Sequence, residues 1–196
     1  TCFADLTEEK ISWLVPGYLA GGILHCVAGY GGEGKSSLVS ALVASITRGV
    51  NWIDGKPLPQ GASRIAILTE EPIRFQTLPR LRLANADLKK ICTVDGVVYR
   101  KEKGEKLESW NLADHVKVTG RFLSENPEVR LLVIDPIGKY MTGKGKQEIN
   151  TWNDSDVRDV LRPWQELAEK SGVAILYIAH FNKGKAERAM NLVTGS

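Results

Sequence analysis

Eight residues in the first fifth of the chain, 29–36, have the types and spacing to hold a row of phosphates. They read Gly-Tyr-Gly-Gly-Glu-Gly-Lys-Ser and match the pattern G-x-x-x-x-G-K-[ST]. In this pattern the glycines let the backbone curl so that its N–H groups face phosphate oxygens, while the lysine contacts the outer phosphates and the hydroxyl contacts Mg²⁺. The residues predicted to bind a nucleotide in this way are Gly29, Gly31, Gly32, Glu33, Gly34, Lys35, Ser36 and Ser37.

The segments on either side of 29–36 support a binding role. An apolar run at 23–28 predicts a buried strand, and the apolar positions of 37–46 predict a buried helix that ends at Gly49. Strand, loop and helix in this order aim the N-terminus of a helix at an anion. A glycine-rich turn without a ligand is the alternative, and this arrangement makes it the weaker one.

A second chemical signal is the apolar strand predicted over 129–134, which ends in a single acid, Asp135. A rigid buried strand can hold a carboxylate beside the Mg²⁺ that also takes the hydroxyl of the phosphate loop. Many strands end in Asp before a turn, so Asp135 alone is weak evidence for a metal site. The presence of the motif at 29–36 in the same chain makes this interpretation much stronger. We therefore predict that Ser36 and Asp135 hold the metal ion together.

Two neighbouring carboxylates, Glu70 and Glu71, follow another apolar strand, predicted over 64–69. In open α/β sheets, ligands sit beyond the carboxyl ends of the strands. One of the two carboxylates is therefore in a position to polarise a water molecule. The alternative interpretation is an acidic first turn of the next helix, with Pro72 near its first position.

His180 follows the last predicted strand, 173–179. At the tip of a strand beside that of Asp135, an imidazole can hydrogen-bond a terminal phosphate and report its presence. A purely structural histidine is an equally good interpretation of the sequence alone.

Length and composition favour one soluble globular domain over residues 1–196. The chain has 43% hydrophobic and 25% charged residues, which is typical of globular proteins. Its apolar runs are too short for a membrane span, and its three cysteines have the spacing of neither a disulfide framework nor a metal site. We therefore expect a cytoplasmic protein that does not enter a membrane. The net charge of +3 is too small to establish nucleic-acid binding.

Other segments predict elements around these residues. We interpret 13–22, punctuated by Pro and Gly, as a lead-in that covers one edge of the nucleotide site. Segment 95–109 is charged and poor in hydrophobic residues, which predicts a mobile surface excursion. Basic and aromatic residues alternate in 138–153, as in segments that follow a sugar–phosphate backbone, although a solvated loop fits equally well. The remaining predictions are helices over 73–86, interrupted at Pro79, over 112–124 and over 154–170, and a short strand over 91–94.

Taken together, these residues resemble the RecA-like ATPases, a group that includes the RepA-type hexameric replicative helicases of plasmids and related AAA-family ATPases of plasmids and phages. The resemblance implies a doubly wound, mainly parallel sheet flanked by helices. It also implies assembly into a hexameric ring with ATP between neighbouring subunits and single-stranded DNA in a central channel. The segments that carry it are 13–22, 29–36, 69–72, 132–136, 180–183 and 193–196.

Roles follow from the resemblance by position. Lys35 is implied to act on the phosphates, Glu70 to be the general base that orients the attacking water, and His180 to sense the γ-phosphate. Glu71 stands where the group usually has Asp. The basic loops at 139–146 and 183–188 are implied to face DNA.

The group's arginine finger normally lies beyond the Val-x-Gly-Ser element, and this sequence stops at that element. An arginine finger contributes roughly 10³–10⁵ to the rate in related enzymes. We therefore expect a domain truncated at its C-terminal end.

Three hypotheses of function remain at this level. The first is a Mg²⁺-ATP-driven, helicase-like DNA motor in plasmid or phage type replication or recombination. The second is a nucleotide-gated DNA-loading or assembly module that hydrolyses little ATP. The third, a small-molecule P-loop kinase, requires an arginine-rich lid and an acceptor pocket, which the sequence indicates poorly.

Overall fold

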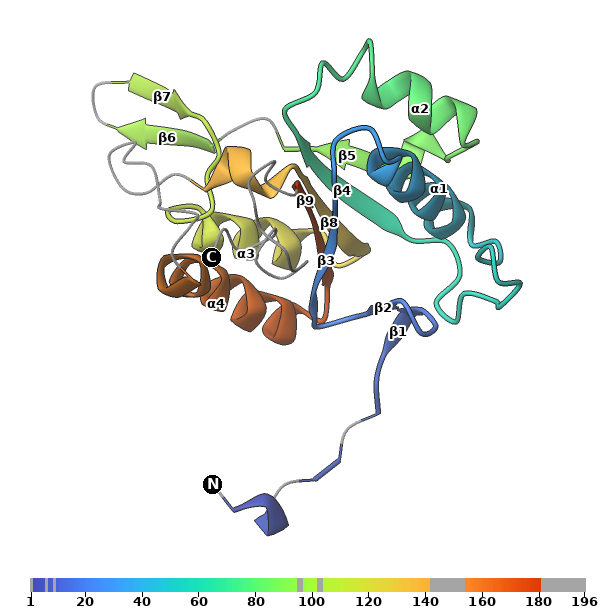
Figure 1. The fold of residues 1–196 in the computed structure, drawn as a ribbon. Helices are drawn as coiled ribbons and strands as arrows, with labels where there is room; N and C mark the ends of the chain where they lie inside the picture. Colours follow the sequence, from blue (N-terminus) through green and yellow to red (C-terminus); the bar gives the residue numbers. More distant parts are fainter. Residues whose placement is uncertain are drawn as a thin grey trace.

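Five parallel strands form the centre of the molecule in the order β3-β9-β8-β4-β5 (Figure 1). The computed structural model describes residues 2–5, 7–8, 10–94, 97–101, 104–141 and 154–180. The strands of the sheet are β3 (Leu24–Gly29), β9 (Ala174–His180), β8 (Val129–Asp135), β4 (Arg64–Thr69) and β5 (Ile91–Thr93). The helices are α1 (Lys35–Arg48), α2 (Thr77–Leu83), α3 (Val116–Glu125) and α4 (Asp154–Ser171).

Helices cover both faces of this sheet, so the prediction of a doubly wound parallel fold is confirmed. Figure 1 shows α1 and α2 on one side and α3 and α4 on the other. Each face has its own apolar core, because successive strand residues point to opposite faces. The α1 face packs Val39, Val43 and Ile46 against Ile65, Val133 and Leu176, and the α4 face packs Trp110, Leu112 and Trp164 against Leu132, Ile134 and Ile175.

The central strands β4 and β8 coincide with their predicted spans. The four inner residues of β4 are buried, and every residue of β8 except Arg130 is buried. Such continuous apolar runs are typical of parallel strands covered on both faces. In the pairing of β4 with β8, Thr69 lies opposite Asp135. The two acids that follow β4 and the acid that ends β8 therefore lie at the same edge of the sheet.

Gly49 ends α1 as predicted, in the left-handed conformation with φ of +67°. A Cβ atom at this position would lie 2.5 Å from the backbone nitrogen of Ala62. We expect Gly49→Ala to lower the free energy of unfolding by about 1–3 kcal/mol, because both the conformation and the close approach disfavour a side chain. Chemical denaturation measures this value. Gly138→Ala is the matched control, since a Cβ there meets no atom within 4 Å, and an equal loss in both variants would contradict the argument.

Two surface segments differ from the sequence predictions. Segment 95–109 contains an antiparallel hairpin of β6 (Val97–Lys101) and β7 (Gly104–Glu108) instead of an irregular excursion. The two strands pair along their whole length, from Val97 opposite Glu108 to Lys101 opposite Gly104.

The lead-in at 13–22 does not cover the predicted nucleotide site. It forms a second hairpin, β1 (Trp13–Val15) with β2 (Leu19–Ala20), and the N–H of Gly22 donates to the carbonyl of Val173 just before β9. The hairpin thus lies at the amino ends of the strands, whereas the phosphate loop follows the carboxyl end of β3 (Figure 1).

Two predicted helices begin later than their apolar spacing indicated. α2 begins at Thr77, which places Pro79 in the first turn, where its missing N–H costs no helical hydrogen bond. Before α3, the side chain of Asn111 accepts from the N–H of Asp114, and the ring of His115 accepts from the N–H of Asn111. These local bonds hold a turn in place of a first helical turn.

Short 3₁₀ turns complete the described chain, at η1 (Phe3–Asp5), η2 (Leu88–Lys90) and η3 (Ile137–Tyr140). Among the described residues, no helix has both the length and the apolar character needed to cross a bilayer.

Candidate functional site

The loop at 29–36 lies at the carboxyl edge of the sheet and leads into α1. Gly32 and Gly34 have φ of +85° and +83°, a conformation that other residues rarely adopt. No atom lies within 4 Å of a Cβ built on either glycine, so the backbone here faces open space. The loop therefore has the open, glycine-lined shape that a phosphate group requires.

Lys35 is buried, and its ammonium group stays within the loop. Its Nζ donates to the carbonyls of Gly29, at 2.8 Å, and Tyr30, at 2.5 Å. These two acceptors satisfy a charge that would otherwise be costly to bury. A phosphate that reaches the loop must therefore draw the ammonium from these carbonyls.

Glu33 also contacts the loop from within. Its carboxylate accepts a hydrogen bond of 2.6 Å from the N–H of Tyr30, although the residue is exposed to solvent. The carboxylate thus takes a backbone donor, which is the kind of group that phosphate oxygens use in such loops. Glu33 therefore lies in the loop as predicted, and its negatively charged carboxylate binds the loop's own backbone.

Ser36 and Asp135 meet at the base of the site. Both residues line one small space, and the Asp135 carboxylate is 9% exposed. Burial raises the pKa of the Asp135 carboxyl above its ordinary value, and the nearby negative charge of Glu71 raises it further. The Ser36 hydroxyl, Arg80 and His180 act in the opposite direction and lower this pKa. A hydroxyl and a carboxylate oxygen side by side form a donor set that suits Mg²⁺.

A cavity of about 230 Å³ opens above the loop. Its lining brings together residues from the loop, from the segment after β4, from α2 and from the end of β9. An adjoining smaller space contains Asp135 and shares Ser36, Glu71 and Arg80 with it. The lining residues of the larger cavity are Gly32, Gly34, Lys35, Ser36, Ser37, Glu71, Arg80 and His180.

His180 lies where its sequence position predicted. It pairs in register with Gly29, the first residue of the loop, so its side chain enters the cavity from the neighbouring strand. The structure therefore brings His180, Lys35 and Ser36 to one place, although they lie far apart in the sequence.

The two acidic residues after β4 have different surroundings. Glu71 lines the cavity, and its carboxylate accepts from Arg80 at 2.5 Å and from the Thr77 hydroxyl at 3.3 Å. Glu70 is exposed, and within the part of the chain that the structure describes its carboxylate has no hydrogen bond or ion pair. Its N–H donates to the carbonyl of Asp135 at 3.3 Å, which ties the tip of β4 to β8.

Arg80 is the site residue that sequence reasoning missed. It lines both spaces of the site and forms an ion pair with Glu71. The sequence predicted only a basic helix here, because an arginine on a helix surface usually faces solvent. The available signal was its position: α2 begins six residues after Glu71, so its first turn remains close to the strand edge.

The predicted DNA-contacting loops lie mostly outside the described residues. Lys139 belongs to η3, whereas residues 142–153 and 183–188 lie outside the described part of the chain. Tyr140, which lies in the basic and aromatic segment 138–153, is buried and packs edge-on against Trp110, with ring centroids 5.3 Å apart, so this ring is not free to stack on a base.

Comparison with known proteins agrees with the geometry of the site. A family model described as an AAA domain matches residues 3–186, which is nearly the whole chain. None of the curated proteins compared with the chain matches it.

Proposed function

The chain belongs to the AAA domain family of P-loop ATPases, and from this premise we propose that it binds and hydrolyses Mg²⁺-ATP at the loop 29–36. The observation that carries the proposal is the convergence of Lys35, Ser36 and His180 on one cavity, with Asp135 in the adjoining space. These groups can meet a triphosphate, a metal ion and a terminal phosphate.

Ser36 and Asp135 would hold the Mg²⁺, which neutralises charge on the phosphates when it is bound. The fit is supported by the position of the two side chains, because both line one small space and so bring two oxygen ligands close together. The buried position of Asp135 limits competition by water for its carboxylate.

The other residues bind, orient and move protons. Lys35 would leave the carbonyls of Gly29 and Tyr30 to contact the outer phosphates. Glu70 is proposed as the general base, because its carboxylate is exposed to solvent and no cation of the described residues holds it away from an attacking water. His180 would donate a hydrogen bond to the terminal phosphate from the tip of β9.

Loss of the Ser36 hydroxyl, or of the negative charge of Asp135, should raise the Mg²⁺ requirement. We expect Ser36→Ala and Asp135→Asn each to lower turnover at limiting Mg²⁺ by about tenfold or more, because the second ligand remains but the pair is lost. Mg²⁺ titrations of ATP turnover measure this effect, and EDTA should abolish turnover in all variants. The Ser37→Ala variant is the control, since Ser37 lines the cavity but is not bonded to Asp135. Identical Mg²⁺ curves for all three variants would contradict the assignment.

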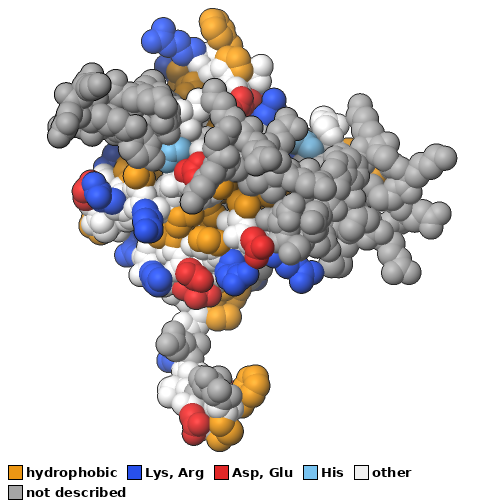
Figure 2. Space-filling model, turned by 90° about the vertical axis from the view of Figure 1, so that its left-hand side faces the viewer, with side chains coloured by type: hydrophobic (Ala, Val, Ile, Leu, Met, Phe, Trp, Pro, Cys, Tyr) orange, Lys and Arg blue, Asp and Glu red, His pale blue; other side chains and the backbone are white. Residues whose placement is uncertain are grey.

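We further propose that the ATPase is a helicase-like motor on single-stranded DNA, assembled as a hexameric ring. The resemblance to RepA-type helicases supports this, together with the basic loops at 139–146 and 183–188. On the face drawn in Figure 2, Lys and Arg side chains of the described residues are interspersed with Asp and Glu side chains. The described surface on that face is therefore not a basic track, and the DNA contact is assigned to the loops.

Turnover with and without single-stranded DNA tests the motor proposal, with the oligomer sized by light scattering in the same solutions. We expect DNA to stimulate turnover severalfold in an assembled ring, and to do so less in a variant with Lys144 and Lys146 changed to Ala. Turnover that is unaffected by DNA in an assembled ring would remove the motor and leave the ATPase.

A nucleotide-gated module is the second candidate, and one observation favours it. Lys35 and Arg80, which both line the cavity, are held by protein groups, Lys35 by loop carbonyls and Arg80 by Glu71. ATP binding must release at least the lysine, so nucleotide binding itself changes the site. ATP-dependent assembly with turnover near background would identify this function.

A further inference from the structure

A second cavity, of about 150 Å³, lies behind the nucleotide site, between α2 and the edge of the sheet formed by β4 and β5. Its lining consists of six aliphatic residues, three threonines and one cysteine, with no charged side chain among the described residues. Its lining residues are Ile67, Thr69, Ile73, Thr77, Leu78, Leu81, Leu88, Ile91, Cys92 and Thr93.

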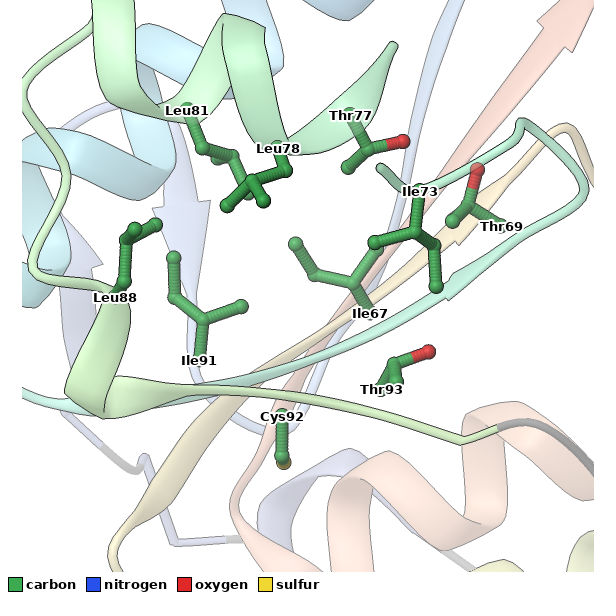
Figure 3. Close-up of a pocket in the computed structure, with 10 residues that line it drawn as sticks. All are labelled: Ile67, Thr69, Ile73, Thr77, Leu78, Leu81, Leu88, Ile91, Cys92 and Thr93. Atoms are coloured by element: carbon green, nitrogen blue, oxygen red, sulfur yellow. The ribbon is translucent and has the colours of Figure 1, made fainter. Parts of the chain in front are cut away.

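The two ends of this cavity differ in chemistry. Figure 3 shows Leu78, Leu81, Leu88 and Ile91 around one end and three threonines, Thr69, Thr77 and Thr93, around the other. The cavity therefore offers an apolar body and a hydroxyl-lined end to whatever enters it.

The threonine end is also a wall of the nucleotide site. Thr69 and Thr77 line the small space that contains Asp135 as well as the apolar cavity. Thr69 accepts from the N–H of Glu71 at 3.1 Å, and Thr77 donates to the Glu71 carboxylate at 3.3 Å. Glu71 is in turn paired with Arg80. The two threonines thus contact the cavity on one side and the polar network of the nucleotide site on the other.

We propose that this cavity binds a small, neutral, mainly apolar molecule with one hydroxyl or carbonyl group, and that its occupancy is coupled to the nucleotide site through Thr69 and Thr77. An apolar cavity of about 150 Å³ accommodates a ring the size of benzene. The lining offers no counter-charge to an ionised ligand, so a charged molecule would lose its hydration without compensation. The coupling, but not the binding, rests on the proposed ATPase function.

The coupling follows from the shared hydroxyls. A hydroxyl or carbonyl group at the threonine end can hydrogen-bond Thr77, which alters its bond to Glu71 and thereby the hold of Glu71 on Arg80. Coupling between two sites is reciprocal. If the ligand changes the affinity for ATP, then ATP changes the affinity for the ligand by the same factor.

Phenol is the probe for binding, and benzoate is its charged counterpart. Ligand-observed NMR on the full chain should show saturable phenol binding and no benzoate binding. Leu78→Trp extends a ring into the cavity and should weaken phenol binding at least tenfold. Leu83→Trp is the matched control, because Leu83 is on the same helix, is 89% exposed and does not line the cavity. Equal phenol binding by both variants, or equal binding of benzoate, would overturn the proposal.

A second measurement serves if Leu78→Trp does not fold. Ile73→Trp places a ring in the cavity from the segment before α2, where Figure 3 shows Ile73 pointing inward, and should also weaken phenol binding at least tenfold. Phe75→Trp is its control, because Phe75 is 83% exposed and does not line the cavity. Phenol binding by Ile73→Trp equal to that of Phe75→Trp would argue against the site.

ATP affinity measured with and without phenol tests the coupling. We expect at least a twofold change, which should disappear in Thr77→Val, because valine keeps the shape of the cavity and removes the hydroxyl. Phenol binding without any change in ATP affinity would overturn the coupling alone. Phenol binding by a chain that binds no ATP would instead contradict the proposed function and leave the cavity site standing.

Discussion

Lys35→Ala should lower ATP turnover about 10²–10³-fold or more, because the ammonium group of Lys35 is the cation of the phosphate loop. Affinity for ATP should fall by about tenfold or more, since a charge-assisted hydrogen bond to a phosphate is lost. Isothermal titration gives the affinity, and phosphate release gives the turnover. The fold should survive, because Tyr30 is exposed, so water can enter the space left by the lysine side chain and replace the lost donor at both carbonyls.

Lys56→Ala is the matched control for this experiment. Lys56 is an exposed lysine paired with Asp54, and it does not line the cavity. We expect its turnover and ATP affinity to equal those of the unchanged chain. If Lys35→Ala retained ordinary turnover, the loop 29–36 would not be the site of hydrolysis.

Glu70→Gln should reduce turnover by about 10²–10⁴ and leave ATP binding nearly intact, because glutamine keeps the size of the side chain but cannot accept a proton. Single-turnover measurements with saturating ATP separate this loss from a loss of affinity.

The neighbouring variant Glu71→Gln distinguishes the two acids. Glutamine at 71 can still accept from Thr77 but loses the ion pair with Arg80, and a partly exposed ion pair contributes about 1 kcal/mol or less. We therefore expect turnover within about tenfold of the unchanged chain. The reverse pattern, with Glu71→Gln inactive and Glu70→Gln active, would assign the general base to Glu71, which already lines the cavity.

The central strands and the loop 29–36 could be predicted from the sequence because their physics is local. An apolar run bounded by polar residues is sufficient to predict β4 and β8, and Gly49 is sufficient to end α1. The β6–β7 hairpin was missed because its stability depends on pairing across the strands, whereas its composition alone indicates a loop.

The residues of the candidate site also fall into those that the sequence predicts and those that it does not. The motif and the strand-end acid predicted Ser36 and Asp135, and the structure places both in the lining of one small space. The partnership of Arg80 with Glu71 depends on how α2 packs over the edge of the sheet, so no spacing in the sequence indicates it. The distinct surroundings of Glu70 and Glu71 are set by a turn of the backbone that adjacent carboxylates do not specify.

The position of β3 at the edge of the sheet has a consequence for motion. Within the described sheet, β3 is hydrogen-bonded to β9 alone, yet it is the strand that carries the phosphate loop. Edge strands open locally at lower free energy than central ones. A ligand held at the end of β3 opposes that opening by an amount that grows with the ratio of its concentration to its dissociation constant, so the nucleotide would also stabilise an edge strand of the sheet.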